Sequence, residues 1–329
     1  MEKRSSEKFP VKYYSSLTAR SVDWLWFPYI PYGKITVVQG DPGDGKTTFV
    51  LNIAALLSNG LAMPESQDKT IKSKILYQSA EDGVEDTMKP RLMSAGADCD
   101  NIAFIDETEM PLTLDNPRLE SAILETGAKL LVLDPLQAYL GDNGEMNRAD
   151  GIRPKLKQLA AIAARTYCAV IVIGHMNKAG NAKGLYRGLG SIDITAAARS
   201  VLLICRIKSN PSIRVMAQLK NSLAKEGPAV AFEINAGSSV RWIGSYDISA
   251  DELLLGEATL GEDSKIAAAE RILSDMLIDG AKPCLQVYSV CDQQDISKRT
   301  VDRAKKQMDI KSVRRADGWY WMLGGDRDA

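Results

Sequence analysis

The feature that most constrains the fold of this chain is a glycine-rich loop between an apolar strand and a helix. The loop reads Gly40-Asp-Pro-Gly-Asp-Gly-Lys-Thr47, which matches G-x-x-x-x-G-K-[ST] and follows an apolar run at residues 35–38. Its glycines let backbone N–H groups turn inward around an anion, and the helix expected at residues 46–57 directs its positive end there. The motif predicts a phosphate-binding P-loop; the alternative is a plain glycine turn before a helix.

The P-loop pattern gives each residue of the loop an expected role. Lys46 should reach the β and γ phosphates of ATP, and the Thr47 hydroxyl should bind Mg²⁺. ATP and Mg²⁺ are therefore the expected cofactors. The other residues expected to contact the nucleotide are Gly40, Asp41, Pro42, Gly43, Asp44, Gly45 and Thr48.

Apolar segments after the loop alternate with stretches long enough for helices. Strands are expected at residues 75–79, 102–105, 130–133 and 169–174, an alternation typical of a parallel sheet with right-handed crossovers. Four more apolar segments, at residues 201–207, 213–220, 230–235 and 240–243, follow one another with short turns. They indicate antiparallel strands at one edge of the sheet, so the expected fold class is α/β.

Length and composition allow one large domain and one small one. The chain has 329 residues, 45% of them hydrophobic, which is enough for a full α/β core. We expect an ATPase domain at residues 1–245, an acidic linker poor in regular structure at 246–263, and a separate unit at 264–329. In that last unit the sequence predicts a long alanine-rich helix, a short helix, a basic helix and a β-like tail.

Charge and cysteine usage exclude some classes of function. The formal net charge is −1, so any nucleic-acid surface must be local. The five cysteines are scattered and the chain has one histidine, which argues against a disulfide framework or a zinc site. We see no apolar run of membrane-spanning length and no signal peptide, so we expect a cytoplasmic protein without a membrane partner.

Carboxylates follow two of the expected strands. Asp134 ends the run at residues 130–133, where a carboxylate beside the phosphates holds Mg²⁺; the alternative is an aspartate that caps the next loop. Glu81 and Asp82 end the strand at residues 75–79, and ATP hydrolysis needs one acceptor to orient the attacking water. Glu81 is the preferred residue and Asp82 the second; alternatively, both acids start the next helix.

One histidine and two arginines complete the candidate catalytic set. His175 follows the strand at residues 169–174, where it would hydrogen-bond the γ-phosphate and report its loss, although a lone histidine is often structural. Arg187 and Arg199 are both candidates for an arginine finger that acts on a neighbouring subunit. Arg187 is also a candidate for nucleic-acid contact, and surface ion pairing is the plainer alternative for both.

Together these residues resemble the RecA-like core of the RepA family of hexameric replicative helicases, known from plasmids and other mobile elements. The resemblance covers about residues 24–242. It rests on the aromatic lead-in at residues 24–34, the P-loop, Ser79-Ala-Glu-Asp82, Leu131-Val-Leu-Asp-Pro-Leu136, His175-Met-Asn-Lys178 and Tyr186-Arg-Gly-Leu-Gly-Ser191. The aromatic residues of the lead-in (Trp24, Trp26, Tyr29 and Tyr32) are candidates to stack on adenine or DNA, or to form an apolar flap in the core.

The resemblance implies a RecA-like P-loop NTPase core and a set of catalytic roles. By resemblance, Glu81 activates water, Asp134 is the Walker B acid, His175 senses the γ-phosphate and Arg199 is the finger. The family works as a ring, here expected to be a homo-hexamer, that moves along single-stranded DNA. Channel loops are best represented here by residues 177–185, and the core residues expected to contact DNA are Lys178, Lys183 and Arg187.

The last unit departs from the minimal family pattern. Residues 296–308 resemble the recognition helix of a winged helix-turn-helix, with Ser297 as N-cap. Between residues 297 and 315 eight Lys or Arg stand against two Asp, which favours duplex DNA phosphates. The alternative is a helical module for subunit contact. The residues expected to contact DNA are Lys298, Arg299, Arg303, Lys305 and Lys306.

The sequence therefore predicts a Mg-ATP-dependent DNA helicase or translocase that hydrolyses ATP at subunit interfaces. The first alternative is a DNA-binding ATPase that regulates or loads a replication enzyme without unwinding DNA. A second alternative is a signalling ATPase of the circadian-clock type that binds no DNA. The basic helix in the last unit argues against that second alternative.

Overall fold

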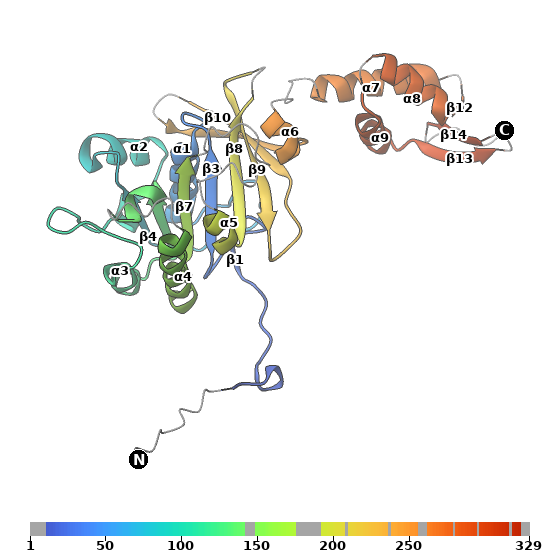
Figure 1. Ribbon diagram of the computed structural model, residues 1–329. Coiled ribbons are helices and arrows are strands. Elements are labelled where there is room, and N and C mark those ends of the chain that lie inside the picture. The colour runs from blue at the N-terminus through green and yellow to red at the C-terminus, as the bar shows by residue number, and fades with distance from the viewer. Residues whose placement is uncertain are drawn as a thin grey trace.

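A computed structural model describes residues 11–141, 149–175, 192–207, 210–235, 238–255, 262–278, 280–294, 296–315 and 318–323. Its centre is a nine-stranded sheet with the strand order β11-β10-β9-β8-β3-β7-β6-β4-β5 (Figure 1). The strands from β3 to β8 pair in parallel, and β9 to β11 add antiparallel pairs beyond β8. The predicted α/β fold with a mostly parallel sheet is confirmed. The strands are β3 (Ile35–Gly40), β4 (Ile75–Ser79), β5 (Ile102–Ala103), β6 (Leu130–Asp134), β7 (Ala169–His175), β8 (Ser200–Arg206), β9 (Ile213–Asn221), β10 (Ala229–Ile234) and β11 (Val240–Tyr246).

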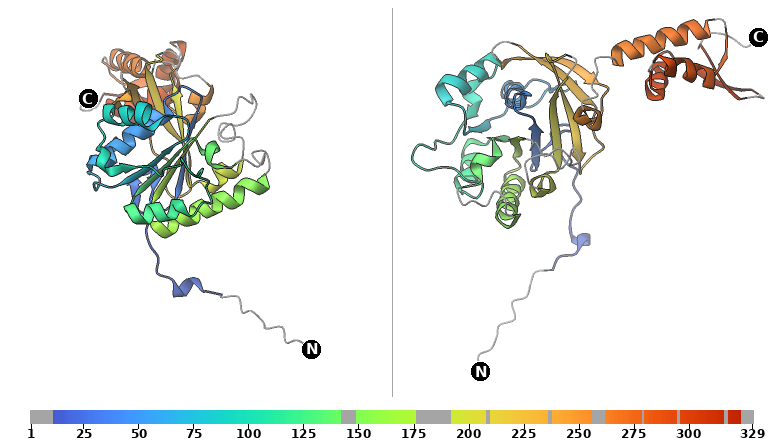
Figure 2. Two further views of the ribbon diagram at one scale, coloured as in Figure 1. Left: turned by 90° about the vertical axis from the view of Figure 1, so that its left-hand side faces the viewer. Right: turned by 45° about the horizontal axis from the view of Figure 1, so that its top comes forward.

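Helices cover both faces of this sheet (Figure 2). One face carries α1 (Lys46–Asn59) and α2 (Lys89–Ser94), and the other carries α3 (Arg118–Thr126), α4 (Ala149–Thr166) and α5 (Ile192–Ala197). Short helical turns lie at η1 (Tyr14–Ser16), η2 (Val84–Met88), η3 (Cys99–Asn101) and η4 (Leu136–Tyr139), and of these η2 and η4 contribute buried side chains to the core.

Side chains of the central strands alternate between two hydrophobic clusters. In β3, Val38 packs with the α1 cluster and Val37 with the α4 cluster, and Val132 and Leu133 of β6 divide in the same way. All four side chains are fully buried. Burial on both faces explains why these strands appear in the sequence as continuous apolar runs rather than as an alternating pattern.

The aromatic lead-in belongs to the core. It forms a small antiparallel pair, β1 (Trp24–Trp26) with β2 (Ile30–Pro31). The Trp26 indole donates to the Pro64 carbonyl at 3.0 Å, and the Tyr29 hydroxyl donates to the Pro228 carbonyl at 2.7 Å. Trp26 and Tyr29 are both buried, so of the two interpretations of this segment the structure supports the apolar flap for these residues.

The segment 246–263 differs from the expected linker, because it contains α6 (Ala250–Leu255). A capping box begins this helix: the Ser249 hydroxyl accepts from the Glu252 N–H at 3.2 Å, and the Glu252 carboxylate accepts from the Ser249 N–H at 2.6 Å. Leu253 is buried against the antiparallel strands. The acidic composition of this segment had suggested a linker poor in regular structure, and the short helix α6 was not predicted.

The residues after α6 form helices and strands with their own hydrophobic cluster. The elements are α7 (Glu262–Leu277), β12 (Lys282–Pro283), α8 (Cys284–Gln293), α9 (Lys298–Gln307), β13 (Lys311–Arg315) and β14 (Gly318–Met322). The three strands pair antiparallel in the order β12-β14-β13. The buried members of the cluster, among them Leu273, Val301 and Trp321, all lie between residues 269 and 321. We refer to residues 262–323 as the C-terminal unit. Across the described residues, we find no helix with the length and apolar character needed to span a bilayer.

Candidate nucleotide-binding site

The glycine-rich loop connects the carboxyl end of β3 to the amino end of α1, as a P-loop requires. Gly43 and Gly45 have φ angles of 83° and 92°, in the left-handed region that glycine adopts without strain. Gly40 is needed for a different reason. A Cβ on Gly40 would lie 2.2 Å from the Ile204 carbonyl oxygen, so a larger residue would force β3 and β8 apart.

Lys46 turns back into the loop. Its ammonium donates to the Gly40 carbonyl at 3.0 Å and to the Asp41 carbonyl at 2.9 Å, and only 4% of the residue is exposed. Burial lowers the pKa of Lys46, and nearby acids, with Asp44 first, oppose that shift. The ammonium is thus held at the loop by two neutral acceptors, and its charge is available to an anion.

Asp134 lies beside the loop at the end of β6 and is 7% exposed. Its carboxylate accepts from the Thr47 hydroxyl and, at 3.2 Å, from the Tyr77 hydroxyl. Burial raises the pKa of Asp134 to about 6, and the charges of Asp82 and Glu81 add to the shift. Hydroxyl and carboxylate oxygens are the hard ligands that Mg²⁺ prefers, so Thr47 and Asp134 fit this ion.

Glu81 and Asp82 have different surroundings. Asp82 forms an ion pair with Arg91 at 2.5 Å, and its N–H donates to the Ser79 hydroxyl at 3.4 Å. Glu81 is exposed and has no ion-pair or hydrogen-bond partner in the part of the chain that the structure describes. It is near enough to Lys46 and Asp134 to act on both electrostatically. Glu81 is therefore the acid better placed to accept a proton or orient water.

Strand pairing brings the predicted residues to one edge of the sheet. Ser79 at the end of β4 pairs with Asp134 at the end of β6, and Gly40 at the end of β3 pairs with His175 at the end of β7. The P-loop, both candidate acids and the histidine backbone thus share the carboxyl edge of the parallel strands. The His175 side chain and all of Lys178, Lys183 and Arg187 lie outside the described residues.

Arg199 lies at the opposite edge. It precedes β8, is exposed, and its N–H donates to the carbonyl of Ile35, the first residue of β3. The P-loop begins five residues later at Gly40, roughly 17 Å away along the strand. Arg199 therefore does not reach the P-loop of its own chain, and a role as a finger requires a second subunit.

Three side chains at this site were not predicted from the sequence. Tyr77 is buried in β4 and donates to Asp134. Arg206 donates to the Gly43 carbonyl at 2.5 Å, and the Arg214 side chain approaches Gly45 from β9. Tyr77 lies in the middle of β4, where the sequence gives no sign of its contact with Asp134. Arg206 ends β8 and Arg214 lies in β9, and only the pairing of these two strands shows where the arginine side chains point.

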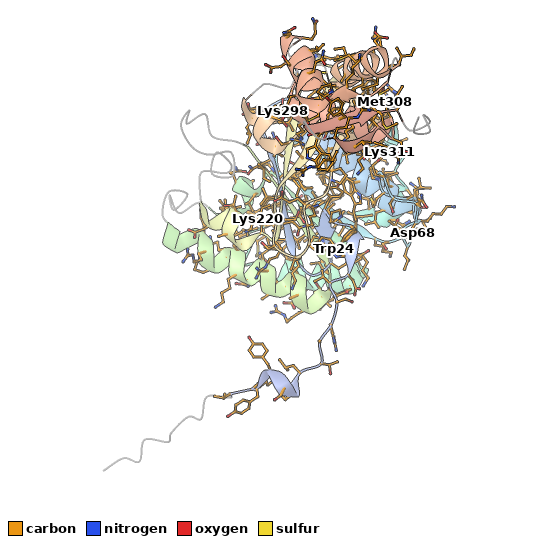
Figure 3. The ribbon with its side chains drawn as sticks, turned by 90° about the vertical axis from the view of Figure 1, so that its right-hand side faces the viewer. Trp24, Asp68, Lys220, Lys298, Met308 and Lys311 are labelled. Atoms are coloured by element: carbon orange, nitrogen blue, oxygen red, sulfur yellow. The ribbon has the colours of Figure 1, made fainter. Side chains whose placement is uncertain are left out.

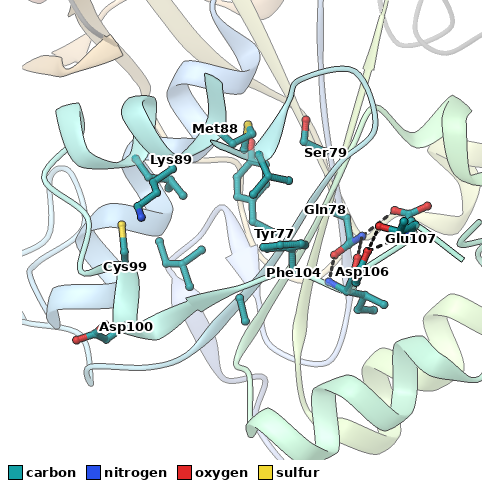
Figure 4. Close-up of a pocket in the computed structure, with 16 residues that line it drawn as sticks. Tyr77, Gln78, Ser79, Met88, Lys89, Cys99, Asp100, Phe104, Asp106 and Glu107 are labelled. Carbon is teal, nitrogen blue, oxygen red and sulfur yellow. Dashed lines mark hydrogen bonds between the residues drawn. The ribbon is translucent and has the colours of Figure 1, made fainter. Parts of the chain in front are cut away.

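A separate cavity of about 490 Å³ lies beside the site, between α2 and the sheet edge at β4 and β5 (Figure 4). Gln78 ties its far wall to β4, because its side-chain amide donates to the Ile105 carbonyl at 3.2 Å and to the Glu107 carboxylate at 2.8 Å. The lining includes Tyr77 but no residue of the P-loop. The cavity is therefore distinct from the phosphate site.

The basic residues predicted in α9 have diverse partners. Ser297 caps the helix as predicted, accepting from the Thr300 N–H at 3.3 Å. Lys298, labelled in Figure 3, lies over the Tyr288 ring. Lys305 donates to the Ser312 hydroxyl at 2.6 Å. Arg299 and Arg303 both pair with Asp247, which follows β11. Lys306 is exposed and has no partner within the described ranges.

Comparison with known proteins agrees with this geometry. The family described as "AAA domain" matches residues 6–181, more than half of the chain, and the chain belongs to this family. The fold, the P-loop and the family together define a RecA-like P-loop ATPase.

The relatives found include proteins named "DNA repair protein RadA". That of Halalkalibacterium halodurans is 30% identical over 156 residues, which cover 46% of this chain and 30% of the relative. That of Bacillus subtilis is 23% identical over 230 residues, covering 69% of this chain and 44% of the relative. The chain thus spans less than half the length of these curated relatives. These relatives are named for DNA repair, whereas the motifs of the chain resemble those of replicative helicases.

Proposed function

We propose that this protein is a Mg-ATP-dependent DNA helicase or translocase that works as a homo-oligomer, a hexamer. The observation that carries the ATPase part is the shared carboxyl edge, where the P-loop, Thr47 and Asp134 lie together and Glu81 follows the neighbouring strand. The RadA relatives, named for DNA repair, and the basic α9 support DNA as the partner.

In the proposed reaction the P-loop N–H groups and Lys46 bind the phosphates, and Thr47 and Asp134 hold Mg²⁺. An ion held by these two residues would supply positive charge to the phosphate oxygens. Glu81 orients the attacking water, and Asp82 stays paired with Arg91. His175 senses the γ-phosphate, and Arg199 of one subunit completes the site of the next.

We further propose a modular chain with an ATPase domain at residues 1–245 and a winged-helix domain at 264–329. The order of α7, β12, α8, α9, β13 and β14, with the strands arranged β12-β14-β13, supports the winged-helix assignment. In this arrangement α9 enters the major groove of duplex DNA and the β13–β14 hairpin is the wing. Single-stranded DNA passes through the core, where Lys178, Lys183 and Arg187 are the proposed contacts.

The second candidate is a DNA-binding ATPase that regulates or loads another replication enzyme without unwinding DNA. One observation favours it: the basic helix α9 supplies a DNA-contacting surface outside the ATPase core, and a regulator needs no other. The two candidates share the ATPase site and differ in what hydrolysis accomplishes.

One experiment separates the candidates. The native mass of the full-length protein is measured with Mg-ATP, and ATPase activity is measured with and without single-stranded DNA. Strand displacement and translocation are then measured on forks of both polarities. A DNA-stimulated ATPase ring that separates strands supports the helicase. An active oligomer that neither separates strands nor translocates on any fork contradicts the helicase and supports the regulator.

A further inference from the structure

Two arginines lie opposite each other at the P-loop. Arg206 ends β8 and pairs in register with Arg214 of β9, so like charges face each other across an antiparallel pair. Such pairs destabilise a sheet unless another charge compensates them. Arg206 and Arg214, which we call the arginine pair, are therefore an arrangement that needs an explanation.

Both members of the pair are turned to the loop. Arg206 donates to the Gly43 carbonyl at 2.5 Å. The Cδ and Nε atoms of Arg214 lie 3.5 Å from the position that a Cβ on Gly45 would take. Gly45 is the N-cap of α1, so Arg214 lies beside the N–H groups that are expected to bind an anion.

Arg214 also has unused hydrogen-bonding capacity. Its Nη1 donates to the Ser212 carbonyl at 2.8 Å, but its Nε is buried without an acceptor among the described residues. Burial and the charge of Arg206 both lower the pKa of Arg214, and Asp44 opposes the shift. A buried guanidinium N–H without an acceptor is costly, and a phosphate oxygen is the acceptor that matches a guanidinium.

The acids of the loop do not fully account for the pair. Asp44 lies near enough to Arg206 and Arg214 to act on both electrostatically, but it forms no ion pair with either arginine in the part of the chain that the structure describes. Lys46 adds a third cation to the same loop. The three positive charges around the loop are better balanced by the negative charge of a polyphosphate than by Asp41 and Asp44.

We propose that Arg206 and Arg214 bind the phosphates of the nucleotide in the same subunit that supplies the P-loop. This inference rests on the proposed ATPase function and extends it. Arg206 holds the loop through Gly43 and Arg214 supplies a buried donor near Gly45. The β8–β9 pair thereby becomes a wall of the phosphate site.

The test measures binding rather than turnover. Affinities of the full-length protein for ADP and for inorganic pyrophosphate are measured by calorimetry for wild type, Arg206→Gln and Arg214→Gln. One charge-assisted hydrogen bond corresponds to roughly 10- to 100-fold in affinity, and we expect a loss of that size for both ligands in each variant. Arg241→Gln is the matched control, because Arg241 lies on β11 and pairs with Glu233.

Melting temperatures add a second readout. Without ligand, removing one of two facing charges should leave the melting temperature unchanged or raise it, and the rise on adding ADP should shrink. Arg214→Lys retains the charge and should recover part of the affinity, which covers the case in which the Gln variant folds poorly.

Several outcomes overturn the inference. Unchanged affinity for both ligands, with a lower melting temperature without ligand, means that the pair only offsets Asp41 and Asp44. Weaker ADP binding with unchanged pyrophosphate binding means that the arginines contact the base or ribose. The Lys46→Ala variant separates failure of this inference from failure of the proposed function. If Lys46→Ala abolishes ADP binding and the arginine variants bind ADP normally, this inference fails and the proposed function stands.

Discussion

Glu81 and Asp82, two adjacent acids that follow β4, differ in their side-chain partners. Asp82 is paired with Arg91, whereas Glu81 is exposed and acts electrostatically on Lys46 and Asp134. A carboxylate already held by a guanidinium is less free to orient a water molecule. The local environment therefore separates two residues that the sequence leaves as alternatives.

We expect Glu81→Gln to bind ATP with near wild-type affinity and to lose about 10²- to 10⁴-fold in kcat, because only the water-orienting acceptor is removed. Lys46→Ala should weaken both ATP binding and turnover, since its charge meets the phosphates in the ground state. Nucleotide affinity and single-turnover rates measure both effects. Glu85→Gln, an exposed acid in η2, is the control. Normal turnover by Glu81→Gln would move the role to Asp82 or another acid.

A second prediction at the residue scale concerns the effect of Gly40→Ala on stability. Gly40→Ala places a methyl group against the Ile204 carbonyl, and we expect a loss of at least about 2 kcal/mol in unfolding free energy. Gly127→Ala is the comparison. Gly127 has a φ of 69° and nothing within 4 Å of an added Cβ, so its cost should be only the backbone strain of about 1 kcal/mol. Urea denaturation measures both; equal costs would show that β3 and β8 separate easily.

At the scale of elements, strands and the P-loop helix are predictable because their signals are local. Continuous apolar runs define β4, β6 and β7 closely, and the loop motif places α1. The missed helix α6 has a local signal too, a capping box at Ser249 and Glu252, but acidic composition hid it. The contacts of Tyr77, Arg206 and Arg214 depend on which strands become neighbours. The strand order places segments far apart in the sequence side by side, so no local sequence pattern predicts these contacts.

Helix α9 shows why basic residues at helical spacing are not equivalent. Lys305 contacts Ser312 and the Trp321 ring, so its loss would disturb the C-terminal unit as well as any DNA contact. Arg303 pairs with Asp247, so DNA would have to displace an aspartate. Lys306, by contrast, is exposed on the helix and offers the cleanest test of the basic surface.

We expect Lys306→Gln to weaken duplex binding and to reduce the slope of log K against log salt by about 0.9, the value for one phosphate contact. The melting temperature should not change. Lys69→Gln, an exposed lysine of the core, is the control. Affinities measured at several salt concentrations give the slope. A slope equal to that of wild type would remove Lys306 from the DNA interface and favour the interpretation of this unit as a subunit-contact module.

At the scale of the whole molecule, the proposed catalytic residues are divided between two edges of one sheet. The P-loop, Thr47 and Asp134 lie at the carboxyl edge, and Arg199 lies at the start of β8 on the other. No rearrangement of side chains alone brings Arg199 to the phosphates of its own chain. If Arg199 is catalytic, the active unit contains at least two copies of the chain.

A catalytic role of Arg199 across the subunit boundary would make ATPase activity depend on assembly. We expect activity per subunit to rise with protein concentration as the oligomer forms. Arg199→Ala should assemble normally but hydrolyse ATP roughly 10³- to 10⁵-fold more slowly, as in other P-loop enzymes that lose an arginine finger. Arg165→Ala is the control, because Arg165 is an exposed arginine of α4 that pairs with Glu120. Sedimentation velocity and steady-state ATPase assays on the same samples give mass and rate together.

Mixing the Arg199→Ala and Lys46→Ala variants is the decisive experiment. A mixed oligomer contains interfaces where the intact P-loop of one subunit meets the intact Arg199 of the next, so ATPase activity should reappear in the mixture. An inactive mixture of co-assembled variants, or constant activity per subunit through the assembly transition, would exclude action of Arg199 across the subunit boundary.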